Sequence, residues 1–303
     1  MSTRSKYIGC IVGLILGDAL CAPYEGGVLE RGLWRFIGKT KNGKLRFTDD
    51  TQMSMDVAES LIQQNGIDQD HLAIMFSNGY DWSRGYGPEA GRILKNIRNG
   101  KNWRTINKRK YPDGSFGNGA AMRVAPISLF YRDKNSLFEK VKKVSEITHA
   151  HPLAVEGAWI IALSINMALD DTDEKEVVSA VIASCESEKF KNKAIIASEW
   201  LASGAEYKSK EISKALGNGM TALDSCISAL YIALSYRNKQ FDEMIRLVQL
   251  GGGDADTIGS MAGAIWGAYN GKKILDTELM DGVEMPERYK DVAEILYDRS
   301  QAV

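Results

Sequence analysis

Residues 254–268 read Asp-Ala-Asp-Thr-Ile-Gly-Ser-Met-Ala-Gly-Ala-Ile-Trp-Gly-Ala, and this stretch decides the fold. Its apolar periodicity predicts a helix from Thr257 to Asn270. Each Gly inside a helix costs roughly 1 kcal/mol relative to Ala, so several of them need a structural reason. Spacing by four residues puts Gly259, Gly263 and Gly267 on one stripe, where the backbone of a neighbouring helix can approach closely.

A matching stripe of glycines occurs near the start of the sequence, in a helix predicted over Lys6–Cys21. Its members are Gly9, Gly13 and Gly17. Tight helix packing directly behind Asp254 and Asp256 would hold those two carboxylates rigidly, as a metal site demands. The glycine stripes are therefore explained both by close helix packing and by the need to hold the metal-binding carboxylates in place.

Helical periodicity dominates the rest of the chain as well. The other predicted helices are Thr51–Asn65, Asp70–Ser83, Pro88–Asn99, Ala120–Tyr131, Ser136–Ile147, Pro152–Ala168, Asp173–Cys185, Lys191–Ala202, Thr221–Ser235, Phe241–Gln249 and Pro286–Arg299. Strand-like stretches are few and short, the best being Trp34–Ile37 and Leu45–Phe47. Because no Pro- or Ser-rich linker divides the chain, we predict one mostly α-helical domain over residues 1–303.

The composition is that of an ordinary soluble globular protein, with 44% hydrophobic and 25% charged residues. The formal net charge of −1 gives no overall field for nucleic acid or an anionic membrane, so neither partner is expected. The apolar run Tyr7–Leu16 resembles a signal peptide, but glycines interrupt it and it is too short to span a bilayer. We expect a buried first helix in a cytoplasmic protein, with Cys10, Cys21, Cys185 and Cys226 as small core residues.

Two acidic clusters, Thr48-Asp49-Asp50-Thr51 and Asp254-Ala255-Asp256-Thr257, stand about two hundred residues apart, and each leads into a predicted helix. Either cluster alone could cap its helix, because Asp and Thr oxygens accept the free N–H groups of a first turn. A cap needs only one such residue, however, whereas each cluster holds two carboxylates that repel one another. Four aspartates with threonine hydroxyls would form a hard-oxygen site for Mg²⁺ or Mn²⁺, and we favour this interpretation.

Three further segments offer groups for a site. Glu25 lies in the loop after the first helix, where it is either solvated or an additional, mobile metal ligand. Residues 114–123, Gly-Ser-Phe-Gly-Asn-Gly-Ala-Ala-Met-Arg, suit either a tight turn or a phosphate-binding loop before a helix. Phe116 within this loop could stack on a nucleobase or fill the core. His149 and His151 are spaced as a zinc pair, but no third nitrogen or sulfur ligand is evident, so a substrate contact or a helix cap is favoured.

These motifs together resemble the ADP-ribosylglycohydrolase family, which includes the dinitrogenase reductase-activating glycohydrolases and the ADP-ribosylhydrolases. Five motifs in the right order make this signal far more specific than any one alone, and they run along nearly the whole chain. Departures are small, such as Cys21 where Gly is more usual, and none removes an acidic residue. The matching segments are Gly-Asp-Ala-x-x-Ala-Pro-x-Glu at 17–25, Phe-Thr-Asp-Asp-Thr-Gln-Met at 47–53, Gly-Ser-Phe-Gly-Asn-Gly-Ala-Ala-Met-Arg at 114–123, Thr-His-x-His-Pro at 148–152 and Gly-Gly-Asp-Ala-Asp-Thr at 252–257.

The resemblance implies an all-α fold, a compact single-domain orthogonal helical bundle around a two-metal centre of Mg²⁺ or Mn²⁺. It implies an ADP-ribosylated protein or another ADP-ribose conjugate as the partner. The metal ligands that it implies by position are Glu25, Thr48, Asp49, Asp50, Asp254, Asp256 and Thr257. The substrate-binding residues that it implies are Ser115, Phe116, Gly117, Asn118 and Gly119, which match a diphosphate loop with an adenine-packing aromatic, and His149, near ribose and phosphate.

We therefore expect a metal-dependent hydrolase that releases ADP-ribose, with Asp49 or Asp50 handling the proton. Two alternatives stay open: a non-catalytic ADP-ribose-binding or crystallin-like relative, and a two-metal phosphodiesterase or phosphatase. The linkage that is cleaved, the oligomeric state and the choice between Mg²⁺ and Mn²⁺ are open at this stage. Specificity is expected from rim loops such as Asp81–Pro88 and Gly26–Lys44, and Arg84 and Tyr86 are expected to be exposed there.

Overall fold

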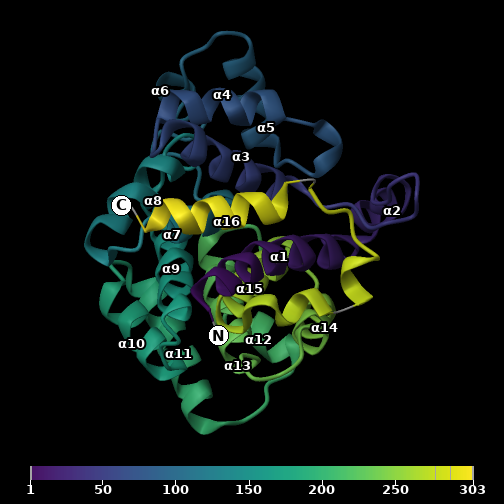
Figure 1. The fold of residues 1–303 in the computed structure, drawn as a ribbon, viewed down its shortest axis with the longest axis vertical. Helices are drawn as coiled ribbons and strands as arrows, with labels where there is room; N and C mark the ends of the chain where they lie inside the picture. The colour runs from purple at the N-terminus through teal and green to yellow at the C-terminus, as the bar shows by residue number, and fades with distance from the viewer. Residues whose placement is uncertain (1, 277, 287, 302–303) are drawn as a thin grey trace.

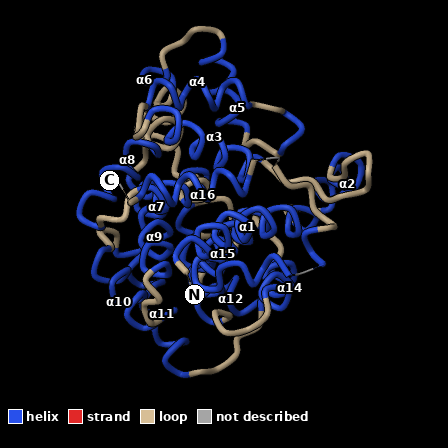
Figure 2. The backbone as a smooth tube through the Cα atoms, viewed as in Figure 1, coloured by secondary structure: helices blue, strands red, loops and turns tan. Residues whose placement is uncertain are grey.

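A computed structural model describes residues 2–276, 278–286 and 288–301, and within these ranges the chain forms helices, turns and loops but no strand (Figure 2). The prediction of an all-α fold is confirmed. The α-helices are α1 (Thr3–Cys21), α2 (Val28–Ile37), α3 (Asp49–Gln64), α4 (Gln69–Gly79), α5 (Pro88–Arg98), α6 (Trp103–Ile106), α7 (Ala125–Phe130), α8 (Lys134–Ser145), α9 (Pro152–Leu169), α10 (Glu174–Ser184), α11 (Glu188–Ser203), α12 (Ser209–Ala215), α13 (Cys226–Ser235), α14 (Phe241–Gly251), α15 (Ala255–Asn270) and α16 (Tyr289–Ser300). Short 3₁₀ turns lie at η1 (Ala22–Tyr24), η2 (Trp82–Arg84), η3 (Asn118–Ala120), η4 (Ala222–Asp224), η5 (Gly271–Asp276) and η6 (Glu278–Met280).

The first and fifteenth helices pack side by side at the centre of the fold (Figure 1). Their glycine stripes face one another with backbone against backbone. A Cβ atom placed on Gly13 would lie 2.1 Å from the carbonyl oxygen of Gly263, and one on Gly263 would lie 2.0 Å from that of Gly13. Equivalent contacts join Gly17 to Gly259 and Gly9 to Gly267. Six glycines are therefore required because no Cβ fits between these two helices.

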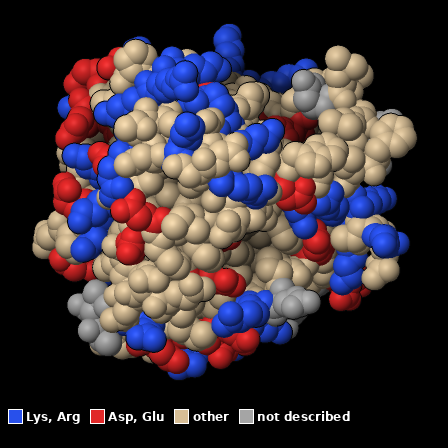
Figure 3. Space-filling model, turned by 90° about the horizontal axis from the view of Figure 1, so that it is seen from above, with Lys and Arg blue, Asp and Glu red and all other residues tan. Residues whose placement is uncertain are grey.

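The other helices cover this central pair. Helices α9, α13 and α14 pack against α15, and α16 packs along α1 (Figure 1). Helix α3 lies between the central pair and the group formed by α4, α5 and α6. Helices α1 and α9 are long and apolar enough by composition to cross a membrane, but 83% and 89% of their apolar segments are buried inside the protein, as in core helices. Basic and acidic side chains are interspersed on the face seen in Figure 3. Cys10, Cys21 and Cys226 are buried free thiols, and Cys185 is half-buried.

Two segments differ from the predicted structure. Trp34–Ile37 was expected as a strand, but it ends helix α2. The reason is a helical spacing that this short segment does not reveal, since Leu29, Leu33 and Phe36 follow one another at intervals of four and three residues. Leu45–Phe47 was also expected as a strand. In the structure Leu45 forms only two isolated bridges, one to Lys39 and one to Val283, so no strand is formed there.

Helix boundaries elsewhere differ by a few residues, with two larger changes. The helix predicted from Thr221 begins at Cys226, because residues 222–224 form the 3₁₀ turn η4. The helix predicted from Ala120 begins at Ala125, because residues 118–120 form the 3₁₀ turn η3 and residues 121–123 form a turn. Helices α2, α6 and α12 were not predicted. The last two are only four and seven residues long, which is too short to show a clear apolar period.

Helix α3 carries an enclosed carboxyl group outside the site described below. The Oδ2 atom of Asp56 is buried with no hydrogen-bond partner among the described residues, and it lies where α4 ends at Gly79. Burial, with a smaller contribution from Glu59, raises the pKa of Asp56 to about 8. The unfolded chain has the ordinary value near 3.8, so the folded state binds the proton more tightly.

Asp56→Asn is therefore expected to change how stability depends on pH. A raised folded-state pKa means that the contribution of Asp56 to stability is fully present below the unfolded value and is lost as the pH rises towards about 8. The variant should match the wild type in acid and exceed it by a few kcal/mol, to order of magnitude, at mildly alkaline pH. Urea unfolding across this range measures the difference, with the exposed Asp113→Asn as the control. Parallel stability curves for Asp56→Asn and the wild type would contradict the assignment.

Candidate functional site

Two helix N-termini that are distant in the sequence meet in one place. Asp49 and Asp50 form the first turn of α3, and Asp256 and Thr257 form the first turn of α15. The Thr257 hydroxyl lies 3.5 Å from Asp50 Oδ1 and can donate to it. The two acidic clusters thus lie next to each other in the structure, as predicted.

Glu25 completes this group from the loop after η1. One carboxylate oxygen each of Glu25, Asp254 and Asp256 lie within 4.8 Å of one another, which is close enough to share a cation. Asp254 and Asp256 are buried, whereas Glu25 is half-buried. The chain thus places a partly exposed acidic residue from a loop beside buried acidic residues from a helix.

The capping interpretation holds for one cluster only. Thr48 caps α3, because its hydroxyl oxygen accepts the Asp50 N–H at 3.2 Å. Asp254 occupies the capping position of α15 but makes no side-chain capping bond to the described residues. The carboxylates of the second cluster are therefore not used as a helix cap.

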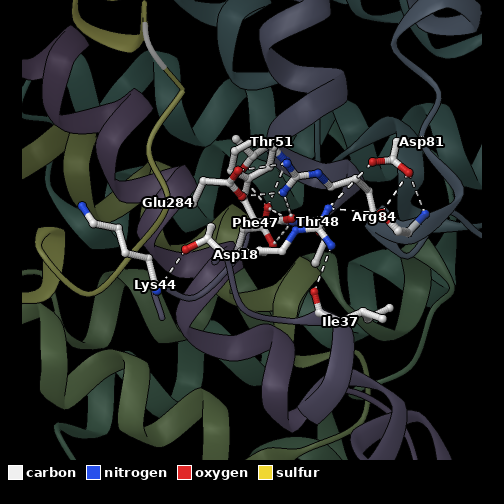
Figure 4. Close-up of polar contacts among 12 residues, drawn as sticks. Asp18, Ile37, Lys44, Phe47, Thr48, Thr51, Asp81, Arg84 and Glu284 are labelled. Carbon is white, nitrogen blue, oxygen red and sulfur yellow. Dashed lines mark hydrogen bonds and ion pairs between the residues drawn. The ribbon is translucent and has the colours of Figure 1, made fainter. Parts of the chain in front are cut away.

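Asp18 organises the first cluster, and the sequence analysis did not assign it a role. This residue is fully buried in α1. Its Oδ2 accepts from the Thr48 N–H at 2.9 Å, the Thr51 N–H at 3.0 Å and the Thr51 hydroxyl at 2.6 Å (Figure 4). Asp18 therefore fixes the turn from which Asp49 and Asp50 project. The signal that could have found it is a carboxylate inside an otherwise apolar helix.

Asp18→Ala is expected to lower the free energy of unfolding by roughly 3 kcal/mol or more, because it leaves several buried donors without an acceptor. The exposed cap Asp133, which accepts from the Asn135 N–H, provides a matched control. Asp133→Ala should cost much less, because it removes only an exposed helix cap. Chemical unfolding of both variants tests this difference, and equal losses would contradict the role given to Asp18.

Arg84 holds the segment before Thr48 from the other side. It was expected to be exposed, but only 13% of its side chain is. Its guanidinium donates to the Phe47 carbonyl at 2.8 Å and pairs with Glu284 at 2.6 Å, and it lies over the Phe47 ring (Figure 4). Tyr86, also expected to be exposed, is half-buried with an enclosed hydroxyl. Arg84 faces inward because Glu284 and the Phe47 carbonyl accept its hydrogen bonds, and Tyr86 packs edge-on against Tyr80.

A cavity of about 280 Å³ extends from the acidic group to the Gly-rich loop. Its lining includes all the predicted site residues except Thr48: Glu25, Asp49, Asp50, Ser115, Phe116, Gly117, Asn118, Gly119, His149, Asp254, Asp256 and Thr257. The Phe116 side chain is 46% exposed, so of the two alternatives, filling the core is excluded. Its ring lies edge-on to His151 and Tyr111 and leaves an apolar surface at the cavity. The structure thus joins every predicted segment in one cleft.

Two Gly-Asn-Gly triplets, at residues 117–119 and 217–219, converge on Asp254. The Asn118 side-chain amide donates to the carboxylate of Asp254 and to the Ser225 hydroxyl. The Asn218 carbonyl accepts the Asp254 N–H at 2.8 Å. Asn118 was predicted to bind substrate, but its amide is directed at Asp254, and Asn218 was not predicted at all. The repeated triplet in the sequence was the signal for it.

The two neighbouring histidines have different environments. His151 caps α9, because its Nδ1 accepts the Leu153 N–H at 3.1 Å. His149 is buried at the cavity wall, with Nδ1 2.8 Å from the Thr148 hydroxyl. Burial, reinforced by the nearby positive charge of Arg123, lowers the pKa of His149 to about 3, so its ring is neutral. The predicted helix cap is thus made by His151, whereas the substrate contact of His149 stays a prediction.

The electrostatics of the acidic group favour a bound cation. Burial raises the pKa of Asp49, Asp50 and Asp256 well above the ordinary range, and neighbouring carboxylates raise it further. Asp50 Oδ2 and Asp256 Oδ1 are buried with no hydrogen-bond partner among the described residues. Buried carboxylate oxygens without donors are costly, and a divalent cation compensates them. The residues present therefore fit a hard metal ion.

Comparison with known proteins agrees with this geometry. The sequence profile of the ADP-ribosylglycohydrolase family matches residues 1–303. The chain belongs to the ADP-ribosylglycohydrolase family. This member of the family is therefore a hydrolase, as the sequence predicted, and the recognition of the family is confirmed.

Individual relatives of this family member cover most of its chain. ADP-ribosylhydrolase ARH3 of Homo sapiens is 29% identical over 88% of this chain and 86% of its own length. An uncharacterised protein of Archaeoglobus fulgidus is 30% identical over 97% of both chains. A solved structure described as an ADP-ribosylglycohydrolase-related protein complex superposes with a TM-score of 0.71 at 23% identity, covering 98% of this chain and 99% of that one. At 23% identity, the likeness to this solved structure concerns the fold alone.

Proposed function

We propose that this protein hydrolyses the bond between the anomeric carbon of ADP-ribose and a modified protein side chain, or a related conjugate, and releases ADP-ribose. The observation that carries the proposal is the cleft itself. At one end stand five carboxylates, two of which have a buried oxygen without a partner, and at the other stands a Gly-rich loop with an exposed aromatic ring. The names of the ADP-ribosylhydrolase relatives support it.

The cleft accommodates the parts of ADP-ribose in order. Phe116 offers a ring face on which adenine can stack, because an exposed aromatic at a cavity rim can stack on any nucleobase. Residues 115–119 line the cavity and offer backbone N–H groups for the diphosphate, except for Asn118, whose N–H donates to the Met220 carbonyl at 3.0 Å. The distal ribose would then reach the acidic end, where its anomeric carbon lies near Asp49 and Asp50.

We assign the divalent cations, Mg²⁺ or Mn²⁺, to Glu25, Asp49, Asp50, Asp254, Asp256 and Thr257, with Thr48 placed behind them as the helix cap. When bound, the cations would supply positive charge that orients the ribose hydroxyls and makes water more acidic. This charge complements the transition state of glycoside hydrolysis, in which positive charge develops at the anomeric carbon while the leaving group carries electrons away.

The carboxylates of α3 would take up and return the proton during the reaction. The bond from the anomeric carbon to the side-chain oxygen or nitrogen breaks, and the electron pair leaves with that atom. The oxygen of water bonds to the carbon, and one of its protons passes to the carboxylate of Asp49 or Asp50, which can then protonate the leaving group.

The test measures free ADP-ribose released from two defined peptides, one modified on serine and one on arginine, with Mg²⁺, Mn²⁺ or EDTA. Metal-dependent release from either peptide is expected, and the peptide that reacts identifies the linkage. Formation of AMP instead would support a phosphodiesterase, because that reaction breaks the diphosphate. Binding of ADP-ribose with no product from either peptide would favour the non-catalytic relative.

A further inference from the structure

Arg123 is a fully buried arginine with no ion pair among the described residues. Its guanidinium lies over the Phe76 ring. Its Nη1 donates to the Gly119 carbonyl at 2.8 Å, and its Nη2 donates to the Thr148 hydroxyl oxygen at 2.8 Å. A buried cation is costly unless its donors are used, and these donors are used on the Gly-rich loop and on the residue before His149.

The contact with Arg123 determines the direction of the next hydrogen bond. Arginine can only donate, so the Thr148 oxygen accepts from it. The second partner of that hydroxyl is His149 Nδ1, 2.8 Å away. If Nδ1 also donated, the hydroxyl hydrogen would be buried without an acceptor among the described residues, at a cost of about 1 kcal/mol or more. The Thr148 hydroxyl therefore donates to Nδ1.

This leaves the ring hydrogen of His149 on Nε2, because a neutral imidazole carries only one. Nε2 faces the cavity beside the Gly-rich loop. A Cβ atom placed on Gly117 would lie 3.3 Å from Nε2, and one placed on Gly119 would lie 2.8 Å from it. The ring thus borders the backbone at which, on the proposed function, the diphosphate lies.

We propose that Thr148, oriented by Arg123, is a positioning residue that fixes His149 in its Nε2–H tautomer, so that a neutral donor faces the diphosphate of the substrate. This inference rests on the proposed function for the identity of the ligand. Phosphoryl oxygens only accept hydrogen bonds, so the other tautomer would place a lone pair against them. The low pKa of His149 is consistent with a ring that stays neutral while it does this.

The tautomer is measured directly by long-range ¹H–¹⁵N NMR of the imidazole rings. The sequence has three histidines, His71, His149 and His151, so the His149 signal is identified by its loss in His149→Gln. We expect the Nε2–H pattern in the wild type and in Thr148→Ser, and a mixed or Nδ1–H pattern in Thr148→Val. An Nδ1–H pattern in the wild type, or no change in Thr148→Val, would overturn the proposal whatever the enzyme acts on.

Calorimetry then tests the consequence for binding. Thr148→Val should weaken ADP-ribose binding by roughly 10-fold, the scale of one charge-assisted hydrogen bond, while Thr148→Ser should bind as the wild type does. Adenosine, which has no phosphate, should bind all three proteins equally. An equal loss for adenosine and ADP-ribose would indicate a merely structural role and overturn the proposal. Failure of the wild type to bind ADP-ribose would overturn the proposed function instead, and the NMR result would still decide the tautomer.

Discussion

Gly263→Ala is expected to lower the free energy of unfolding by about 3 kcal/mol or more, the upper range for overpacking in a core. The added methyl group would lie 2.0 Å from the carbonyl oxygen of Gly13, and backbone cannot move aside as a flexible side chain can. Helices α1 and α15 would have to separate along their whole glycine contact. Chemical unfolding followed by circular dichroism measures the loss.

Gly32→Ala is the matched control, since it makes the same chemical change in the interior of α2. A Cβ atom there meets no described atom within 4 Å. Removing a helical glycine without a clash should leave stability unchanged or raise it by up to about 1 kcal/mol. Opposite signs for the two variants are therefore expected. If Gly263→Ala were as stable as the wild type, the close approach of the two helices would be wrong.

Asp256→Asn is expected to remove metal-dependent turnover, by roughly 10²-fold or more, the scale on which enzymes lose rate when one group at the reacting centre is removed. Asn keeps the shape of the side chain but loses the charge that a divalent cation needs. Release of ADP-ribose and binding of Mn²⁺ by calorimetry should fall together. Unchanged Mn²⁺ affinity in this variant would show that Asp256 is not a ligand.

The stability of the same variant separates loss of a ligand from misfolding. Burial raises the pKa of the Asp256 carboxyl, so in metal-free protein its charge is unfavourable, and Asn should melt at the same temperature or higher. The wild type should gain thermal stability on addition of Mn²⁺, because the ion binds the folded state. Asp256→Asn should lose that gain, whereas the exposed Asp291→Asn should keep it.

The sequence was sufficient to predict features that depend on residues close together in the chain. The two glycine stripes and the two acidic clusters are visible as short patterns, and each leads to the correct expectation about its surroundings. Helix boundaries followed for the same reason wherever the apolar period ran for three or more turns. Trp34–Ile37 shows the limit, because a four-residue segment with Trp34, Phe36 and Ile37 does not distinguish a strand from the end of a helix.

What the sequence could not provide depends on contacts made across the fold. Asp18 acts on a turn thirty residues away, and Asn218 acts on Asp254, so neither role exists until the helices pack. Arg84 is similar: it was placed at the rim because its loop is polar, yet Glu284 and the Phe47 carbonyl draw it inward. Such partners lie far apart along the chain, and no short pattern indicates them.

The glycine contact also has a consequence for how the protein is made. Ribosomes synthesise α1 first, but the helix that it touches most closely is encoded some 240 residues later. Until α15 emerges, an apolar helix with three bare backbone positions has no proper partner, and a contact so remote in sequence is slow to form. We expect nascent chains that stop before Gly259 to associate with chaperones, and folding to be completed only after nearly the whole chain has left the ribosome.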